Sequence, residues 1–204
     1  IKNTIRKIAT SRVYALAGSD DAEATELDPE NTLLWRANHR RLEVEAIRDA
    51  VLLVSGQLDL EPQKGSIVQT VGDGIVGRDL QANRFVTQNK KRSVYLPIVR
   101  GNLPEMLKLF DFPEPSIISG SRDVTTVATQ ALFMMNSDFM VSQSDALAGR
   151  VLGETEMDDD ARVDLAYRLT LGREPSDEET KTALAFVEET TASLDQGQSK
   201  KDND

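Results

Sequence analysis

The feature that most constrains the fold of this chain is the helical spacing of its apolar residues. In several segments, alanine, valine, leucine and isoleucine recur every three to four positions, which places them on one face of an α-helix. Capping residues mark several helix ends, such as Ser176 with Glu179, where each side chain can bind the other residue's backbone N–H. The sequence therefore predicts a mainly α-helical domain. The predicted helices cover residues 2–17, 28–35, 40–54, 104–110, 125–135, 137–152, 158–171 and 176–194.

Residues 64–100 interrupt the helical pattern. The stretch 64–92 is rich in glycine and has little helical periodicity, which predicts a minor irregular or β excursion. Residues 93–99 favour a short extended piece, with Pro97 marking an edge or a break.

A glycine motif within this excursion matches G-x-G-x-x-G, the phosphate-binding turn of dinucleotide folds. It runs Gly72-Asp73-Gly74-Ile75-Val76-Gly77. Nucleotide binding also requires a long helix after the motif and an acidic residue about 20 positions later. No aspartate or glutamate occurs between Leu80 and Pro104, so we interpret the motif as a glycine turn.

We expect the chain to be part of a longer polypeptide, because it starts at Ile1 without an initiator methionine or a signal-like segment. Residues 1–17 are interpreted as the terminal helix of an upstream region. Residues 18–195 are predicted to form a single helical domain, and residues 196–204 a disordered polar tail. No apolar run approaches the roughly 20 residues that span a bilayer, so no transmembrane segment is predicted in this fragment.

Charge and composition argue against several kinds of chemistry. The net charge is −10, and residues 101–204 carry 9 basic and 21 acidic side chains. Long-range repulsion therefore argues against a nucleic-acid partner, although an acidic surface that keeps the protein soluble explains the same charge. The chain has no cysteine, and His39 is its only histidine. We therefore predict no zinc site, no haem attachment and no other cofactor.

Three charged residues form the centre of the candidate binding site. If one helix runs through residues 35–54, Arg36, Arg40 and Glu43 lie on the face that carries the apolar stripe. Charges on a core-facing stripe are costly unless they are paired. They would form either a packed Arg–Glu network or the rim of an anion-binding pocket. The opposite face is predicted to be solvated, and it carries Arg41, Glu45, Arg48 and Asp49.

Short motifs along nearly the whole chain, taken in order, carry a family likeness. They read Asp28-Pro29-Glu30-Asn31, Leu33-Leu34-Trp35-Arg36, Arg40-Arg41-Leu42-Glu43-Val44-Glu45-Ala46-Ile47-Arg48-Asp49, Arg92-Ser93-Val94-Tyr95-Leu96-Pro97-Ile98-Val99-Arg100, Leu109-Phe110-Asp111-Phe112-Pro113-Glu114-Pro115, Thr125-Thr126-Val127-Ala128-Thr129-Gln130-Ala131-Leu132-Phe133-Met134-Met135-Asn136-Ser137, Ala166-Tyr167-Arg168-Leu169 and Leu171-Gly172-Arg173-Glu174-Pro175-Ser176. This series resembles the planctomycete-specific domain of unknown function, although Ala128 stands where that family often has proline.

The resemblance implies a place near the carboxyl end of large proteins, but no established activity. Some of those proteins also carry a cytochrome-c-like domain, whose haem motif has no counterpart here. Because full-length members resemble exported, envelope-associated proteins, the resemblance implies an extracytoplasmic or cell-envelope location.

The function that these observations favour is a non-catalytic structural or interaction module, packed against upstream domains of the same polypeptide. The alternative is a small-ligand or glycan-binding domain, lined by Arg36, Arg40, Glu43, Tyr95 and Arg100. A carboxylate-based hydrolase is a third class, because 34 acidic residues always allow some carboxylate pair, but no spacing singles out a pair. A deep pocket with convergent polar groups would favour ligand binding, and a flat apolar patch near residues 1–17 would favour domain packing.

Overall fold

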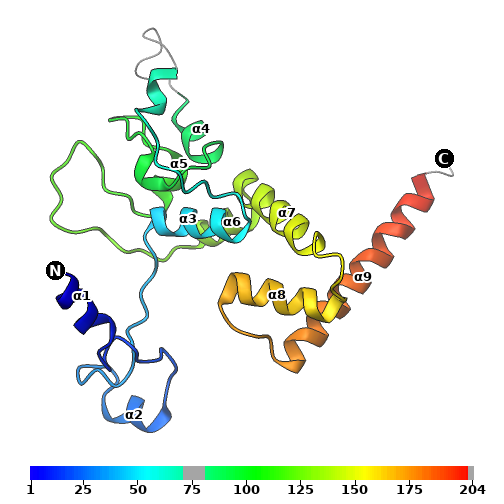
Figure 1. Ribbon diagram of the computed structural model, residues 1–204, viewed down its shortest axis with the longest axis horizontal. Coiled ribbons are helices and arrows are strands. Elements are labelled where there is room, and N and C mark those ends of the chain that lie inside the picture. Colours follow the sequence, from blue (N-terminus) through cyan, green and yellow to red (C-terminus); the bar gives the residue numbers. More distant parts are fainter. Residues whose placement is uncertain (71–80, 202–204) are drawn as a thin grey trace. The chain divides into compact units, whose positions relative to one another are not determined.

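The protein is described here by a computed structural model of residues 1–70 and 81–201, in which nine α-helices and two short 3₁₀ turns follow one another (Figure 1). In these residues, β structure is limited to an isolated parallel bridge between Asp59 and Lys91. The predicted mainly α-helical fold is therefore confirmed. The glycine motif at residues 72–77 lies outside the described residues.

The chain divides into two compact units, Ile1–Leu42 and Glu43–Asp204. The domain limits predicted from the sequence, residues 1–17, 18–195 and 196–204, stay a prediction. Across the described residues, none of the helices combines the length and the apolar character that crossing a bilayer requires.

The first unit contains two short helices, α1 (Lys2–Ala9) and α2 (Ala22–Leu27). Helix α1 is shorter than the predicted helix over residues 2–17. After it, the hydroxyls of Thr10 and Ser11 donate hydrogen bonds to the carbonyls of Arg6 and Ile8, at 2.8 and 2.7 Å. Such bonds offer the backbone an alternative to continued helix.

The helix predicted over residues 28–35 is wrong, because Asp28 organises a series of turns instead. Its carboxylate accepts the backbone N–H groups of Thr32 and Leu33, at 3.0 and 2.8 Å. Asn31 and Leu34 have φ values of 54° and 55°, in the left-handed region that a right-handed helix cannot include. A helix continuous through residues 35–54 is therefore also wrong, and α3 (Val44–Val54) begins only after Glu43.

The hydrophobic core lies in the second unit and surrounds α3. Val44 and Leu52 of α3 are fully buried, one on either side of Arg48 along the same helix face. Phe110 belongs to this core and packs edge to face on the partly buried Phe133, with ring centroids 5.8 Å apart. The buried apolar cluster consists of Val44, Leu52, Val86, Leu96, Leu103, Met106, Leu107, Phe110 and Phe139.

The excursion over residues 64–100 contains helical turns rather than strands in its described part. The elements are η1 (Ile67–Thr70), α4 (Ala82–Thr87) and η2 (Ser93–Tyr95). The extended piece predicted at residues 93–99 therefore begins as a 3₁₀ turn. The Asp49 carboxylate holds its first residue, since it accepts both the backbone N–H and the hydroxyl of Ser93 at 2.7 Å.

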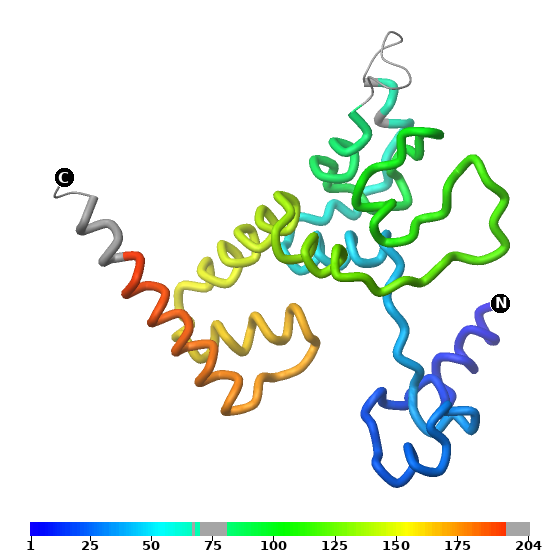
Figure 2. Tube along the Cα trace, turned by 180° about the vertical axis from the view of Figure 1, so that it is seen from behind, coloured from blue at the N-terminus to red at the C-terminus, as the bar shows by residue number. Residues whose placement is uncertain are grey.

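The remaining helices follow the predicted segments closely. They are α5 (Glu105–Leu109), α6 (Ala128–Asn136), α7 (Asp138–Leu152), α8 (Asp159–Leu171) and α9 (Asp177–Lys201). Ser137 separates α6 from α7 and caps α7, while Gly172 ends α8 with a φ of 69°. Helices α8 and α9 pack on each other as a hairpin, which Figure 2 shows from behind. Helix α9 extends past the predicted end at residue 194.

Candidate functional site

Arg48 anchors the segment that follows α4 to helix α3. Its guanidinium is completely buried and donates to the backbone carbonyls of Val86 and Lys91 at 2.9 Å each, and also to the carbonyl of Asn89. It lies 3.7 Å from the Asp49 carboxylate. Burial lowers the pKa of Arg48 to about 10, so the side chain stays positively charged at neutral pH. The prediction that Arg48 is solvated is therefore wrong.

Arg122 ties the long segment between α5 and α6 to the start of α3. It makes two parallel hydrogen bonds to Glu45 at 2.7 Å, lies 3.3 Å from Glu43, and covers the Phe112 ring at 5.1 Å. The hydrogen bonds from Arg122 lower the pKa of Glu45. Glu45 therefore makes the stronger ion pair with an arginine, whereas the sequence pattern placed Glu43 in the arginine–glutamate network.

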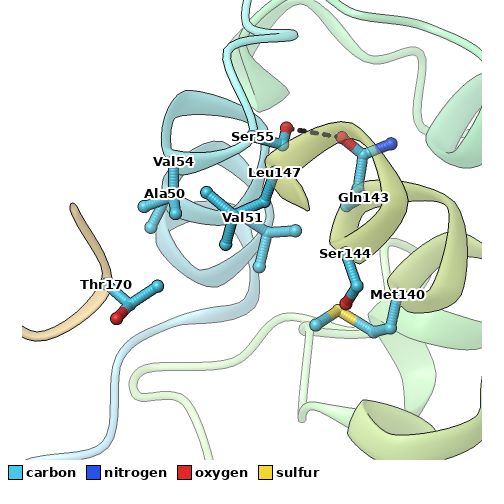
Figure 3. A pocket seen from close by; sticks show the side chains of 9 residues that line it. All are labelled: Ala50, Val51, Val54, Ser55, Met140, Gln143, Ser144, Leu147 and Thr170. Atoms are coloured by element: carbon cyan, nitrogen blue, oxygen red, sulfur yellow. Dashed lines mark hydrogen bonds between the residues drawn. The ribbon is translucent and has the colours of Figure 1, made fainter. Parts of the chain in front are cut away.

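An apolar pocket lies between α3 and α7, with one residue of α8 at its edge (Figure 3). Its volume is about 280 Å³, close to the lower end of the range for ligand pockets, roughly 300–1,000 Å³. Five of its nine lining residues are apolar and none is charged. The lining consists of Ala50, Val51, Val54, Ser55, Met140, Gln143, Ser144, Leu147 and Thr170.

The polar groups in the pocket wall are mostly engaged within the protein. The Ser55 hydroxyl donates to the Gln143 side-chain oxygen at 2.7 Å, and Figure 3 shows this bond joining α3 to α7. The Thr170 hydroxyl donates to the carbonyl of Ala166 at 2.7 Å. Ser144 lines the pocket and is exposed, so its hydroxyl is accessible to a bound molecule.

A sequence model of a protein family of unknown function, PSD1 (DUF1553), matches residues 1–187. The chain belongs to the PSD1 family. Comparisons with curated proteins and with solved structures found no match. Since the PSD1 description names no activity, the geometry of the site has to support any functional proposal.

The structure places the five predicted site residues of this PSD1 chain in both units. Arg36, in the first unit, lies 3.4 Å from Asp20 and stacks on Trp35 at 5.1 Å. Arg40 is exposed and lies outside any helix. In the second unit, Glu43 precedes α3, Tyr95 ends η2 and is half-buried, and Arg100 is exposed. None of the five lines the apolar pocket, and their role in binding stays a prediction.

The sequence pattern did not indicate the pocket residues of the PSD1 domain, because they look like ordinary residues of amphipathic helices. Ala50, Val51 and Val54 belong to the apolar stripe predicted for residues 40–54, and nothing in that stripe distinguishes a pocket wall from a filled core. The pairing of Ser55 with Gln143 joins residues 88 positions apart, so no local spacing reveals it. In the described residues, no group of three or more His, Cys, Asp or Glu side chains could hold a metal ion.

Proposed function

We propose that this PSD1 domain is a non-catalytic structural or interaction module of a longer polypeptide, and that the α8–α9 hairpin supplies its contact surface. The supporting observation is the exposure of apolar side chains on the hairpin. None of the described side chains from residue 144 to residue 194 is buried, while Val187 and Leu194, seven residues apart and so on one face of α9, are 56% and 63% exposed. Contiguous exposed apolar side chains mark surfaces that another protein segment covers.

The spacing on α9 indicates how that surface is shaped. Leu184, Val187, Thr191 and Leu194 follow one another at three- and four-residue intervals, so they form one stripe along the helix. Leu184 is half-buried, whereas Val187 and Leu194 are exposed. The stripe is partly covered at Leu184 and exposed beyond it. Its exposed part is suited to bind a helix or a groove of the upstream region.

The proposal can be tested by measuring binding between the 204-residue chain and the upstream part of the longer polypeptide, prepared separately. Calorimetric titration should show binding that Val187→Asp weakens by about tenfold or more, since the change places a charge in the contact. Ala185→Asp is the matched control, because Ala185 is exposed on the opposite side of α9. No binding, or equal weakening by both variants, would contradict the proposal.

Small-ligand binding is a second candidate function, and the pocket between α3 and α7 is the observation that favours it. The pocket is lined mainly by apolar side chains and has a few polar groups, as small-molecule sites have. This candidate replaces the predicted arginine-rimmed lining with residues from α3, α7 and α8. It is compatible with the interaction module, because the α9 stripe and the pocket share no residue.

A further inference from the structure

We infer that the pocket between α3 and α7 selects small, uncharged and mainly apolar molecules, with room for one hydrogen-bonding group near Ser144. This inference rests on small-ligand binding, the second proposed function, and names the chemical class of ligand. It follows from three properties of the pocket: the absence of charge in its lining, the engagement of its polar groups, and its size.

The absence of charge excludes ionic ligands. The nine lining residues include no Asp, Glu, Lys, Arg or His. An ion that entered this pocket would lose water without gaining an opposite charge or a set of strong hydrogen bonds, which is unfavourable. Carboxylates, phosphates and ammonium ions are therefore poor ligands.

The engagement of the polar groups limits the number of hydrogen bonds that a ligand can receive. The Ser55 hydroxyl is bonded to the side-chain oxygen of Gln143, and the Thr170 hydroxyl is bonded to its own helix. Ser144 lies on the exposed side of α7, where its hydroxyl can donate to a carbonyl or ether oxygen or accept from a hydroxyl. Sugars carry many hydroxyls that this lining cannot satisfy, so a glycan is disfavoured.

The size and the apolar walls favour a compact hydrocarbon body. Ala50, Val51, Val54, Met140 and Leu147 provide the walls, and the volume of about 280 Å³ has room for one or two rings or a short chain. An apolar ligand gains by covering these walls, because it removes apolar surface from water. Met140 adds an adaptable wall, because its unbranched side chain has several low-energy conformations.

The test compares a neutral and an anionic fluorescent probe that share one aromatic framework. 2-Methoxynaphthalene is uncharged, and 2-naphthalenesulfonate carries a sulfonate on the same two rings. We expect the neutral probe to bind the 204-residue chain at a single site, at least about tenfold more tightly than the anionic probe. We also expect octanol to displace the neutral probe and octanoate to fail at equal concentration.

Two phenylalanine substitutions on α7 locate the bound probe. Ser144→Phe places a ring over the pocket, and it should weaken binding of the neutral probe by about tenfold or more. Ser142→Phe makes the same change two residues away on an exposed position outside the lining, and it should leave binding within about twofold. Ala50→Phe fills the pocket from α3 and should also abolish binding, provided that its circular dichroism matches that of the parent chain.

The outcomes separate the ligand class from the site itself. If the anionic probe binds as tightly as the neutral one and Ser144→Phe blocks both, the pocket binds ligands but the inferred class is wrong. If neither probe binds, or if binding is insensitive to Ser144→Phe and Ala50→Phe, both the inference and the second proposed function fail. Loss of binding in Ser144→Phe and Ser142→Phe alike would also overturn the inference, since it places the probe elsewhere.

Discussion

At the scale of single residues, Arg48 shows how a charged side chain can belong to a core. It lies on the same face of α3 as Val44 and Leu52, four residues from each, and its exposed fraction is 0%. Its fork of N–H donors reaches the carbonyls of Val86 and Lys91, in a buried and a part-buried place. The guanidinium therefore holds the end of α4 and the residues after it against α3.

Replacing Arg48 should destabilise the domain strongly. Arg48→Met keeps much of the side-chain volume but removes the donor of one buried and two part-buried carbonyls, so we expect a loss of about 3 kcal/mol in the free energy of unfolding. Arg48→Lys should recover only part of this, because an ammonium cannot reproduce the planar fork. Chemical denaturation measures both, with the exposed Arg40→Met as control. Equal, small losses in Arg48→Met and Arg40→Met would contradict the role of Arg48 as an anchor.

Replacing Glu45 should reduce the stability of the domain more than replacing Glu43 does. This is the reverse of the order that the sequence indicated. Glu45 makes two hydrogen bonds to Arg122 and its side chain is 29% exposed, while Glu43 is 54% exposed and makes a longer contact. We expect Glu45→Ala to cost up to about 1 kcal/mol and Glu43→Ala to cost less than about half of that. Urea unfolding of both variants checks the order, and a larger loss for Glu43→Ala would contradict it.

At the scale of single elements, helix ends are determined by local chemistry. Glu179 accepts the backbone N–H of Ser176 at 2.8 Å and bonds Arg173 at 2.7 and 2.8 Å, while the Ser176 hydroxyl accepts the Glu179 N–H at 3.3 Å. The predicted capping box is thus confirmed, with Arg173 as an additional partner. These bonds lower the pKa of Glu179 from 4.5 to about 2, and the Arg173 bonds are the largest cause.

The start of α9 should therefore respond to acid. A carboxylate whose folded-state pKa is lowered stabilises the fold above its ordinary pKa of 4.5, and this contribution is lost as the pH falls towards 2. Glu179→Gln should lower the melting temperature at neutral pH. Between pH 4.5 and pH 2, the melting temperature of this variant should fall less than that of the parent chain. Thermal unfolding followed by circular dichroism measures this change. Glu178→Gln, one position earlier, is the control, and identical pH profiles for the two variants would contradict the assignment.

At the scale of the whole molecule, the chain forms two compact units that meet in sequence at residues 42 and 43. Residues 37–43 form no helix, and Arg40 is exposed. By contrast, the basic residues after α4 are held in place. The carbonyl of Lys90 accepts the N–H of Asp59 at 2.8 Å, and that of Lys91 accepts Arg48 at 2.9 Å.

Limited proteolysis should therefore distinguish these two basic stretches. We expect trypsin to cut after Arg40 or Arg41 before it cuts after Lys90, Lys91 or Arg92, because cleavage requires local opening of the backbone. The fragment that begins near residue 42 should keep its helical circular dichroism signal, since the hydrophobic core lies entirely within the second unit. Mass spectrometry identifies the cuts, and first cleavage at residues 90–92 would contradict the expectation.

The sequence by itself determined the fold class and the limits of most helices in the second half of the chain. Helical spacing and capping depend on residues within one or two turns of each other, so Ser137, Asp158, Gly172 and Ser176 could be recognised as helix boundaries without any structure. The same local rules failed where side chains bond across turns, because Asp28 fits a helix N-cap as well as it fits the turn that it forms.

Only the tertiary structure decided which charges are buried and where a pocket exists. Arg48 enters the core because the carbonyls of Val86 and Lys91, 38 and 43 residues away, need a donor there. The pocket exists because α3 and α7 approach without filling the space between them, a property of two surfaces rather than of either helix. The periodicity of apolar residues predicts each helix separately. Burial and cavities depend on which helices and segments pack against each other.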